Sequence, residues 1–279
     1  ADLTFPSVSN ISASTATITD STTSFTLTVE YGEEMDVSVN PDITFLTENP
    51  NNTISFASGI WNDSKTYVAT YSVNDGNEEL SDIDVKVENA KDKVGNTQDA
   101  FTENNLFSIE NQNPTVSLTS TAPATVNSTF NVTAEFSELV NDFDINDIAL
   151  TNATASNFIG NFTSYSFDVT PEATGGVTVD INSAVAQDSA TNNNIAATQL
   201  TREADLTLPT VTNITASTST ISDSTTTFTL TVEYSEEMDI SQNPSITIEN
   251  TQNTITFAGG SWNSDNKTYE ATYSDKDEE

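Results

Sequence analysis

A seven-residue stretch of alternating apolar and polar side chains occurs three times in this chain of 279 residues. It reads FTLTVEY at 25–31 and again at 228–234, and FNVTAEF at 130–136. A period of two, rich in aromatic and β-branched residues, predicts a strand that buries one face and exposes the other. Three such strands at similar intervals restrict the chain to repeated β domains.

The repetition extends well beyond these strands. Residues 1–44 align with 204–247 without a gap, and 33 of the 44 positions are identical. The similarity resumes between 55–72 and 256–274, with one insertion. Between these copies lies a more distant one, in which the alternating stretch is offset by 105 positions from the first. The order of the copies is therefore A–B–A′.

We predict three domains from this order: domain A at 1–112, domain B at 113–203 and domain A′ at 204–279. No stretch has the apolar spacing of a helix. Further strands are expected at SVSNISA, DITFL, TISFASG, TYVATYSV and DIDVKVENA in domain A, and at TVSLTS, DIALTN, SYSFDVT, GVTVDINSA and IAATQLT in domain B. About seven strands per hundred residues are typical of an immunoglobulin-like sandwich. The predicted fold is all-β, with tandem immunoglobulin-like β-sandwiches in an extended end-to-end array.

Domain A′ ends about two strands earlier than domain A does. We expect the missing strands to come from the rest of a longer chain, with strands donated by another chain as the alternative.

The charge and composition exclude several classes of partner and site. The chain has 42 acidic and 7 basic side chains, a formal net charge of −35, and neither cysteine nor histidine. Nucleic acids and anionic membranes bind basic surfaces, so neither is an expected partner. Disulfides, thiolate ligands and imidazole ligands are excluded by composition. No apolar run is long enough to predict a membrane span in this segment.

Carboxylates gather directly after the alternating strand, as in EYGEEMD at 30–36 and EYSEEMD at 233–239. In a sandwich of this topology, three segments meet at one end. They are the leading segment before the first strand, the early loop after the alternating strand, and the late loop between the last two strands. The candidate ligands in these segments are Asp2, Glu33, Glu34, Asp36, Asp92 and Asn96 in domain A; Glu110, Asn113, Glu138, Asp144, Asp147, Asp188 and Asn192 in domain B; and Asp205, Glu236, Glu237 and Asp239 in domain A′.

Carboxylate and amide oxygens, without histidine or cysteine, are the ligands that suit Ca²⁺. Clustered carboxylates repel one another, so a junction without a cation should be loose. A bound Ca²⁺ would neutralise them and fix the angle between domains, because binding stabilises the ordered state. An acidic surface that only aids solubility is the simpler reading. The alignment of Glu33, Glu138 and Glu236 in one column favours calcium.

The chain resembles the bacterial immunoglobulin-like (Big) domains, the tandem modules that build the stalks of giant secreted adhesins. The resemblance rests on FTLTVEYGEEMD, SGIWNDSKTYVATYSV and DKVGN in domain A, and on AEFSELVNDFDINDIALTN and AQDSATNNN in domain B. Domain B has DSATN where domain A has DKVGN, which weakens the match in the late loop. The resemblance implies an extended protein, exposure at the cell surface and, often, calcium at domain junctions.

We therefore expect a non-catalytic stalk or spacer of a large extracellular bacterial adhesin, with neighbouring repeats as its partners. One alternative is a self-assembling surface-layer or filament subunit, whose copies contact one another. Another is a carbohydrate-binding module that uses Trp61 and Trp262 to stack on sugars, although core or edge packing explains these residues more simply. Paired carboxylates also occur in glycosidases, but the sequence shows no cleft or acid–base environment for them.

Overall fold

A computed structural model describes residues 3–222, 224–249 and 255–275 of the chain. The chain divides into two compact units, Ala1–Asp205 and Leu206–Glu279. Nearly all the regular structure described is β-strand, with two short 3₁₀ turns at Pro50–Asn52 (η1) and Ile145–Asp147 (η2). No helix among the described residues is long and apolar enough to cross a membrane.

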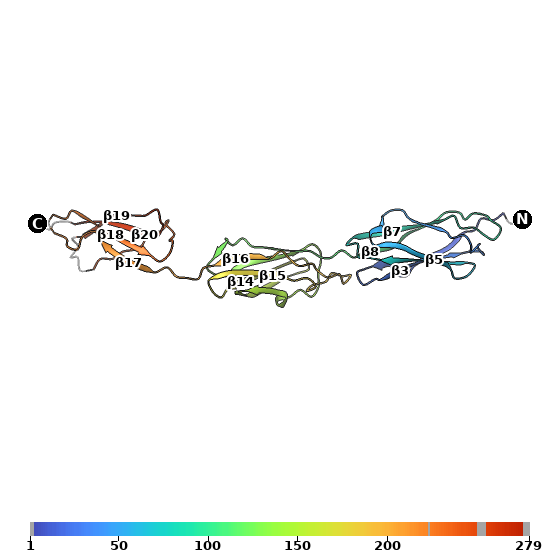
Figure 1. Ribbon diagram of the computed structural model, residues 1–279, viewed down its shortest axis with the longest axis horizontal. Coiled ribbons are helices and arrows are strands. Elements are labelled where there is room, and N and C mark those ends of the chain that lie inside the picture. The colour runs from blue at the N-terminus through green and yellow to red at the C-terminus, as the bar shows by residue number, and fades with distance from the viewer. Residues whose placement is uncertain (1–2, 223, 250–254, 276–279) are drawn as a thin grey trace. The chain divides into compact units, whose positions relative to one another are not determined.

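Domain A consists of two four-stranded sheets, in the orders β1-β3-β6-β5 and β2-β8-β7-β4 (Figure 1). The strands are β1 (Val8–Ala13), β2 (Thr17–Ile18), β3 (Ser24–Tyr31), β4 (Asp42–Phe45), β5 (Ile54–Trp61), β6 (Thr66–Val73), β7 (Glu79–Glu88) and β8 (Phe101–Glu110). The strands predicted for this domain are confirmed, with boundaries that shift by up to three residues.

The core of domain A lies between its two sheets. Phe25, Leu27 and Val29 of β3 are fully buried, as the alternation predicted. The ring of Phe25 lies 4.6 Å from that of Phe107 on β8, so the two sheets are in direct aromatic contact. Each such buried side chain contributes about 1.5–3 kcal/mol relative to an exposed one.

The second strand and the last strand of domain A run in the same direction. β2 pairs in parallel with β8, with Thr17 opposite Ser108 and Ile18 opposite Ile109. Domain B repeats this arrangement between Thr125–Val126 and Leu200–Ala204.

Domain B has the same two-sheet architecture, in the orders β13-β14-β11-β9 and β10-β16-β15-β12. Its strands are β9 (Val116–Thr119), β10 (Thr125–Val126), β11 (Phe130–Phe136), β12 (Ile148–Thr151), β13 (Ala153–Asn161), β14 (Ser164–Pro171), β15 (Gly175–Ile181) and β16 (Leu200–Ala204). Val132, Phe167 and Val169 are fully buried between the sheets. Both domains are immunoglobulin-like β-sandwiches.

One strand prediction is partly wrong, and two long strands, β8 and β13, were not predicted. The prediction for IAATQLT is wrong over its first five residues, because β16 begins only at Leu200. β8 was not predicted, since Asn105 has a positive φ of 53° and the pairing with β7 changes register, which breaks the alternation. β13 was not predicted either. It is an edge strand with exposed side chains on both faces and a register shift beside Asn157.

The second unit contains one described sheet, in the order β17-β18-β20-β19. Its strands are β17 (Val211–Ala216), β18 (Thr227–Tyr234), β19 (Ile255–Trp262) and β20 (Thr268–Asp275). Val8 and Ile11 of domain A are 7% and 3% exposed, whereas their counterparts Val211 and Ile214 are 50% and 61% exposed. Among the described residues of this unit, no second sheet covers that face.

Candidate metal centre

The late loop of domain B, between β15 and β16, is organised by the buried side chain of Asp188. Its Oδ1 accepts hydrogen bonds from the backbone N–H groups of Ala190 (2.8 Å) and Asn192 (2.9 Å). Its Oδ2 accepts a third from Nδ2 of Asn192 (2.9 Å). Such local side chain–backbone bonds replace strand pairing in a turn. These hydrogen bonds, all within the protein, fix the conformation of the loop.

Asp92 plays the same part in the late loop of domain A. Its Oδ1 accepts from the N–H groups of Val94, Gly95 and Asn96 at 2.7–2.9 Å, and its Oδ2 accepts from Nδ2 of Asn96 at 2.7 Å. The spacing from the aspartate to the asparagine is four residues in both domains. The two late loops are therefore built alike, although DKVGN and DSATN share few residues.

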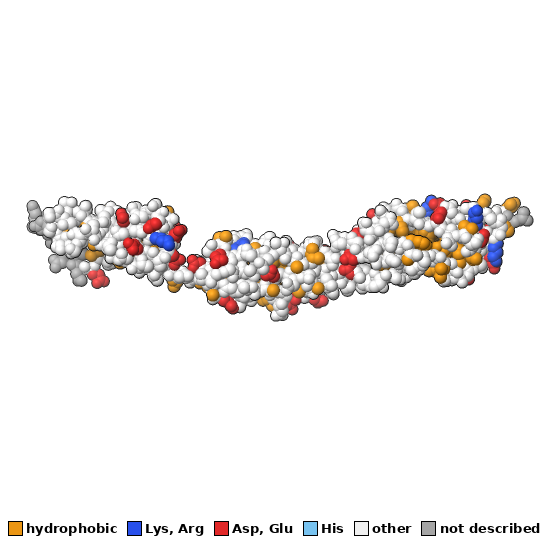
Figure 2. Space-filling view, viewed as in Figure 1, with side chains coloured by type: hydrophobic (Ala, Val, Ile, Leu, Met, Phe, Trp, Pro, Cys, Tyr) orange, Lys and Arg blue, Asp and Glu red, His pale blue; other side chains and the backbone are white. Residues whose placement is uncertain are grey.

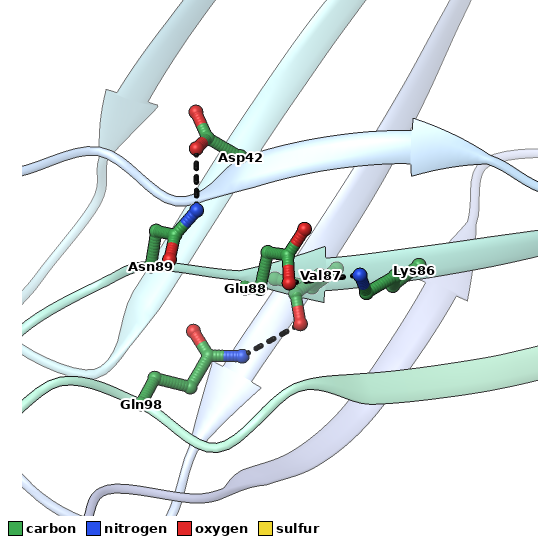
Figure 3. Close-up of polar contacts among 6 residues, drawn as sticks. All are labelled: Asp42, Lys86, Val87, Glu88, Asn89 and Gln98. Atoms are coloured by element: carbon green, nitrogen blue, oxygen red, sulfur yellow. Dashed lines mark hydrogen bonds and ion pairs between the residues drawn. The ribbon is translucent and has the colours of Figure 1, made fainter.

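The late loop of domain A is also tied to its strands by amide side chains (Figure 3). Nε2 of Gln98 donates to the carbonyl of Val87 at 2.9 Å. Nδ2 of Asn89 donates to Oδ2 of Asp42 on β4 at 2.8 Å. The loop is thus anchored to two strands of one sheet, which fixes where Asp92 lies.

Three segments meet at one end of domain B, as the topology predicted. The early and late loops pair through a bridge between Asn141 and Gln187. The leading segment joins them through Asn192, whose Nδ2 donates to both the carbonyl and Oε1 of Glu110 at 3.1 Å. Because Glu110 is also the last residue of β8, this end of domain B is its junction with domain A.

Three carboxylates come together at this junction, one from each segment. Glu110, Glu138 and Asp188 each offer an oxygen atom, and these atoms all lie within 4.8 Å of one another. Asn192 donates to Oε1 of Glu110. The other oxygen, Oε2, is buried and has no hydrogen-bond partner among the described residues. A buried carboxylate oxygen without a donor is costly, and a cation is one group that would satisfy it.

Burial and the neighbouring negative charges raise the pKa values of two carboxyl groups in this cluster. Burial, followed by the charges of Asp188 and Glu138, raises the pKa of Glu110 to about 7. Burial, together with the charge of Asp188, also raises the pKa of Glu138. The ion pairs formed by described residues are Lys86–Glu88 and Lys93–Glu34, and both lie elsewhere. The described side chains therefore bring no basic group to offset the repulsion.

The cluster fits a calcium ion in size and chemistry. Ca²⁺ binds oxygen ligands at about 2.3–2.6 Å, so oxygens on opposite sides of one ion are about 5 Å apart. The oxygen atoms of the cluster all lie within 4.8 Å of one another, close enough for one such ion to contact all three carboxylates. Three carboxylates without nitrogen or sulfur ligands also suit a hard cation better than a transition metal.

The other residues predicted as ligands in domain B are engaged in local structure. Asp144 caps the η2 turn by accepting from the N–H of Asn146, and its own N–H donates to Asp147. Asn113 donates from Nδ2 to the carbonyl of Asn193 at 2.8 Å. Asn192 turns Nδ2 toward the carboxylates. These residues shape the loops around the cluster of three.

In domain A the same three segments also converge, since Met35 bridges to Asp92 and Nδ2 of Asn96 donates to the carbonyl of Thr4 (3.0 Å). Glu33, Glu34 and Asp92 line one small hollow of about 200 Å³.

A lysine also lines this hollow. Lys93 forms an ion pair with Glu34, and this hydrogen bond lowers the pKa of Glu34. Asp36 instead accepts from the N–H and hydroxyl of Ser38, which lowers its pKa. Asp2, the predicted ligand from the leading segment, lies outside the described residues. Domain A therefore differs from domain B in having a basic side chain beside its carboxylates.

The residues predicted in domain A′ are divided between the two units. The backbone of Asp205 belongs to the first unit, where its N–H donates to the carbonyl of Val126 at 2.9 Å. In the second unit, Oε1 of Glu236 is buried without a partner among the described residues, as Oε2 of Glu110 is. Asp239 accepts from the N–H of Ser241 at 3.0 Å, and Glu237 is exposed.

One junction residue was missed by the sequence analysis. Asp20, in the turn between β2 and β3, donates its N–H to Oδ1 of Asn192 at 3.3 Å. Burial, followed by the charges of Asp75 and Asp188, raises the pKa of the Asp20 carboxyl. No local sequence pattern marks Asp20, because its contact with Asn192 depends on how domains A and B meet.

Comparison with known proteins agrees with this description. A sequence search found no curated protein that matches the chain. The family model of the bacterial immunoglobulin-like domain matches residues 110–204, a span that begins at Glu110 and includes Glu138 and Asp188. Domain B, together with Glu110 at the end of β8, is thus similar to the bacterial immunoglobulin-like domain family.

Proposed function

We propose that this chain is a non-catalytic spacer from the stalk of a large extracellular bacterial adhesin, stiffened by calcium at its domain junctions. The observation that carries the proposal is the cluster of Glu110, Glu138 and Asp188. One of its carboxylates comes from the last strand of domain A and two come from the loops of domain B. The family match, the A–B–A′ repeat and the net charge of −35 support the same conclusion.

The residues of the junction would act by coupling two folded domains. Glu110 ends β8 and points its carboxylate at the loops of domain B, so any force that moves the domains apart must separate it from Glu138 and Asp188. When bound, calcium would supply the positive charge that makes this contact favourable. Asn192 holds the backbone and side chain of Glu110 in place from the late loop. The proposed partners are neighbouring repeats of the same protein.

The test is a comparison of the chain in a chelator and in excess Ca²⁺. We expect a higher melting temperature with Ca²⁺, because a ligand present at a hundred times its dissociation constant adds about 2.7 kcal/mol to stability. Small-angle scattering should show a larger maximum dimension in the same condition. Identical scattering and melting curves would falsify the calcium part of the proposal. Polymerisation on adding Ca²⁺ would instead indicate a filament or surface-layer subunit.

A further inference from the structure

A groove runs along β5 of domain A, beside apolar side chains that the fold leaves exposed. Figure 2 shows hydrophobic side chains gathered over this part of domain A. Phe56 and Ile60 on β5 are 61% and 58% exposed, and Leu46 after β4 is 52% exposed. β4 and β5 are edge strands of the two sheets. The groove therefore lies along an open side of the sandwich.

The groove has two parts that meet at Asn40. One part, of about 680 Å³, is lined by residues 40–49 and by Phe56. The other, of about 870 Å³, is lined by Met35, Asp36, Val37, Asn40, Ile60, Trp61, Asp63 and their neighbours. Volumes of this size are typical of small-ligand sites. From Phe56 to Trp61 the strand rises about 17 Å, enough for a short linear ligand.

Trp61, which lines this groove, differs in hydrogen bonding from its counterpart in domain A′, Trp262. Nε1 of Trp262 donates to the carbonyl of Gln242 at 2.9 Å, which ties that tryptophan to the early loop. Nε1 of Trp61 is buried and has no partner among the described residues. The early loop of domain A is thus not bonded to the indole. The indole of Trp61 therefore lacks the hydrogen bond that holds Trp262 in place.

We propose that this groove binds a neutral oligosaccharide. A ligand here must offer hydrogen-bond donors to Asp36, Asp63 and Asn40 and an apolar surface to Ile60 and Trp61. A sugar combines hydroxyl groups with faces of C–H bonds, so it meets both needs. The net charge of −35 disfavours anionic ligands. The polar lining disfavours a purely apolar ligand.

Domain A′ provides an internal control. It has Ser261 where domain A has Ile60, and Glu249 where domain A has Leu46. It therefore lacks two of the apolar contacts. We assign the binding to domain A alone.

The two tryptophans allow this assignment to be tested on the whole chain, because Trp61 and Trp262 are the only ones it contains. Trp262→Phe leaves Trp61 as the sole reporter, and Trp61→Phe leaves Trp262. Each variant is titrated with neutral glucan, mannan, galactan and xylan oligosaccharides up to about 10 mM, a range that detects millimolar dissociation constants. Far-UV circular dichroism checks that both remain folded.

The expected result is a saturable change in Trp61 emission with at least one oligosaccharide and none in Trp262 emission. Adding the exposed substitution Ile60→Ser to Trp262→Phe should weaken that binding about tenfold, since it removes apolar contact while leaving the indole in place. Unchanged Trp61 emission with every sugar overturns the proposal. So does an equal response from Trp262, or binding that Ile60→Ser leaves intact.

Discussion

Oδ1 of Asn192 accepts a hydrogen bond from the backbone N–H of Asp20, 172 positions earlier in the chain, at 3.3 Å. The same carboxamide donates from Nδ2 to Glu110 and to Asp188. One fully buried side chain thus bonds a turn of domain A, the last strand of domain A and the late loop of domain B. The protein's own groups thus form a polar connection across the junction.

Replacing this side chain should weaken the junction measurably. We expect Asn192→Ala to lower the free energy of unfolding by about 2 kcal/mol or more, because buried groups on both domains lose their partners. Urea denaturation followed by circular dichroism measures the change. Asn193→Ala is the matched control, since Asn193 is exposed and its side chain, among the described residues, accepts a hydrogen bond from Gln187 alone. Equal stability of the two variants would contradict the central role of Asn192.

Stability should depend on pH through Glu110. Its pKa in the folded chain is about 7, above the ordinary value of 4.5. Between these values the folded state keeps a proton that the unfolded state has lost, so stability falls as pH rises from about 4.5 to 7. In chelator, the urea midpoint should be lower at pH 7.5 than at pH 5. Glu110→Gln should flatten this difference. A variant with the same pH dependence as the natural chain would show that Glu110 does not cause it.

Calcium affinity should depend on carboxylates of the cluster and not on acidic residues in general. Glu138→Gln removes one ligand charge, and we expect at least about a tenfold loss of Ca²⁺ affinity in titration calorimetry. Glu172→Gln removes the same charge from an exposed site and should leave affinity nearly unchanged. If both substitutions reduce affinity equally, the binding is diffuse electrostatic attraction.

One glycine in domain B should tolerate no side chain. Gly160 has a φ of +139°, and a Cβ there would lie 2.3 Å from the carbonyl oxygen of Ser164. We expect Gly160→Ala to cost about 2 kcal/mol or more through clash and backbone strain. At Gly176 the nearest atom to an added Cβ is 3.9 Å away. Thermal denaturation should therefore show a much smaller shift for Gly176→Ala, and a similar shift for both would contradict the geometry.

The sequence predicts best where side-chain burial alone decides the structure. β3, β11 and β18 alternate strictly, because one face of each packs against the core, and their positions were predicted closely. β8 and β13 were missed, since bulges and asparagines with positive φ interrupt their pattern. Those conformations depend on the partner strand, which no local pattern reveals.

The candidate site, too, could be predicted from the sequence only in part. Sequence pattern placed Glu110, Glu138 and Asp188 at one end of domain B because the topology brings their segments together. It could not separate them from Asp144 and Asp147, which have the same chemistry but cap a 3₁₀ turn. It also could not find Asp20, since that contact depends on how two domains meet.

The parallel pairing of the second strand with the last strand in domains A and B has a mechanical consequence. Tension on the two ends of domain A pulls β2 and β8 in opposite directions along their common axis, because the strands run the same way. The load is then a shear, and the hydrogen bonds between the strands must break together. An antiparallel pair would open one bond at a time from its end. The same geometry recurs between β10 and β16. Domains A and B therefore each contain a parallel strand pair that is loaded in shear when the domain is stretched.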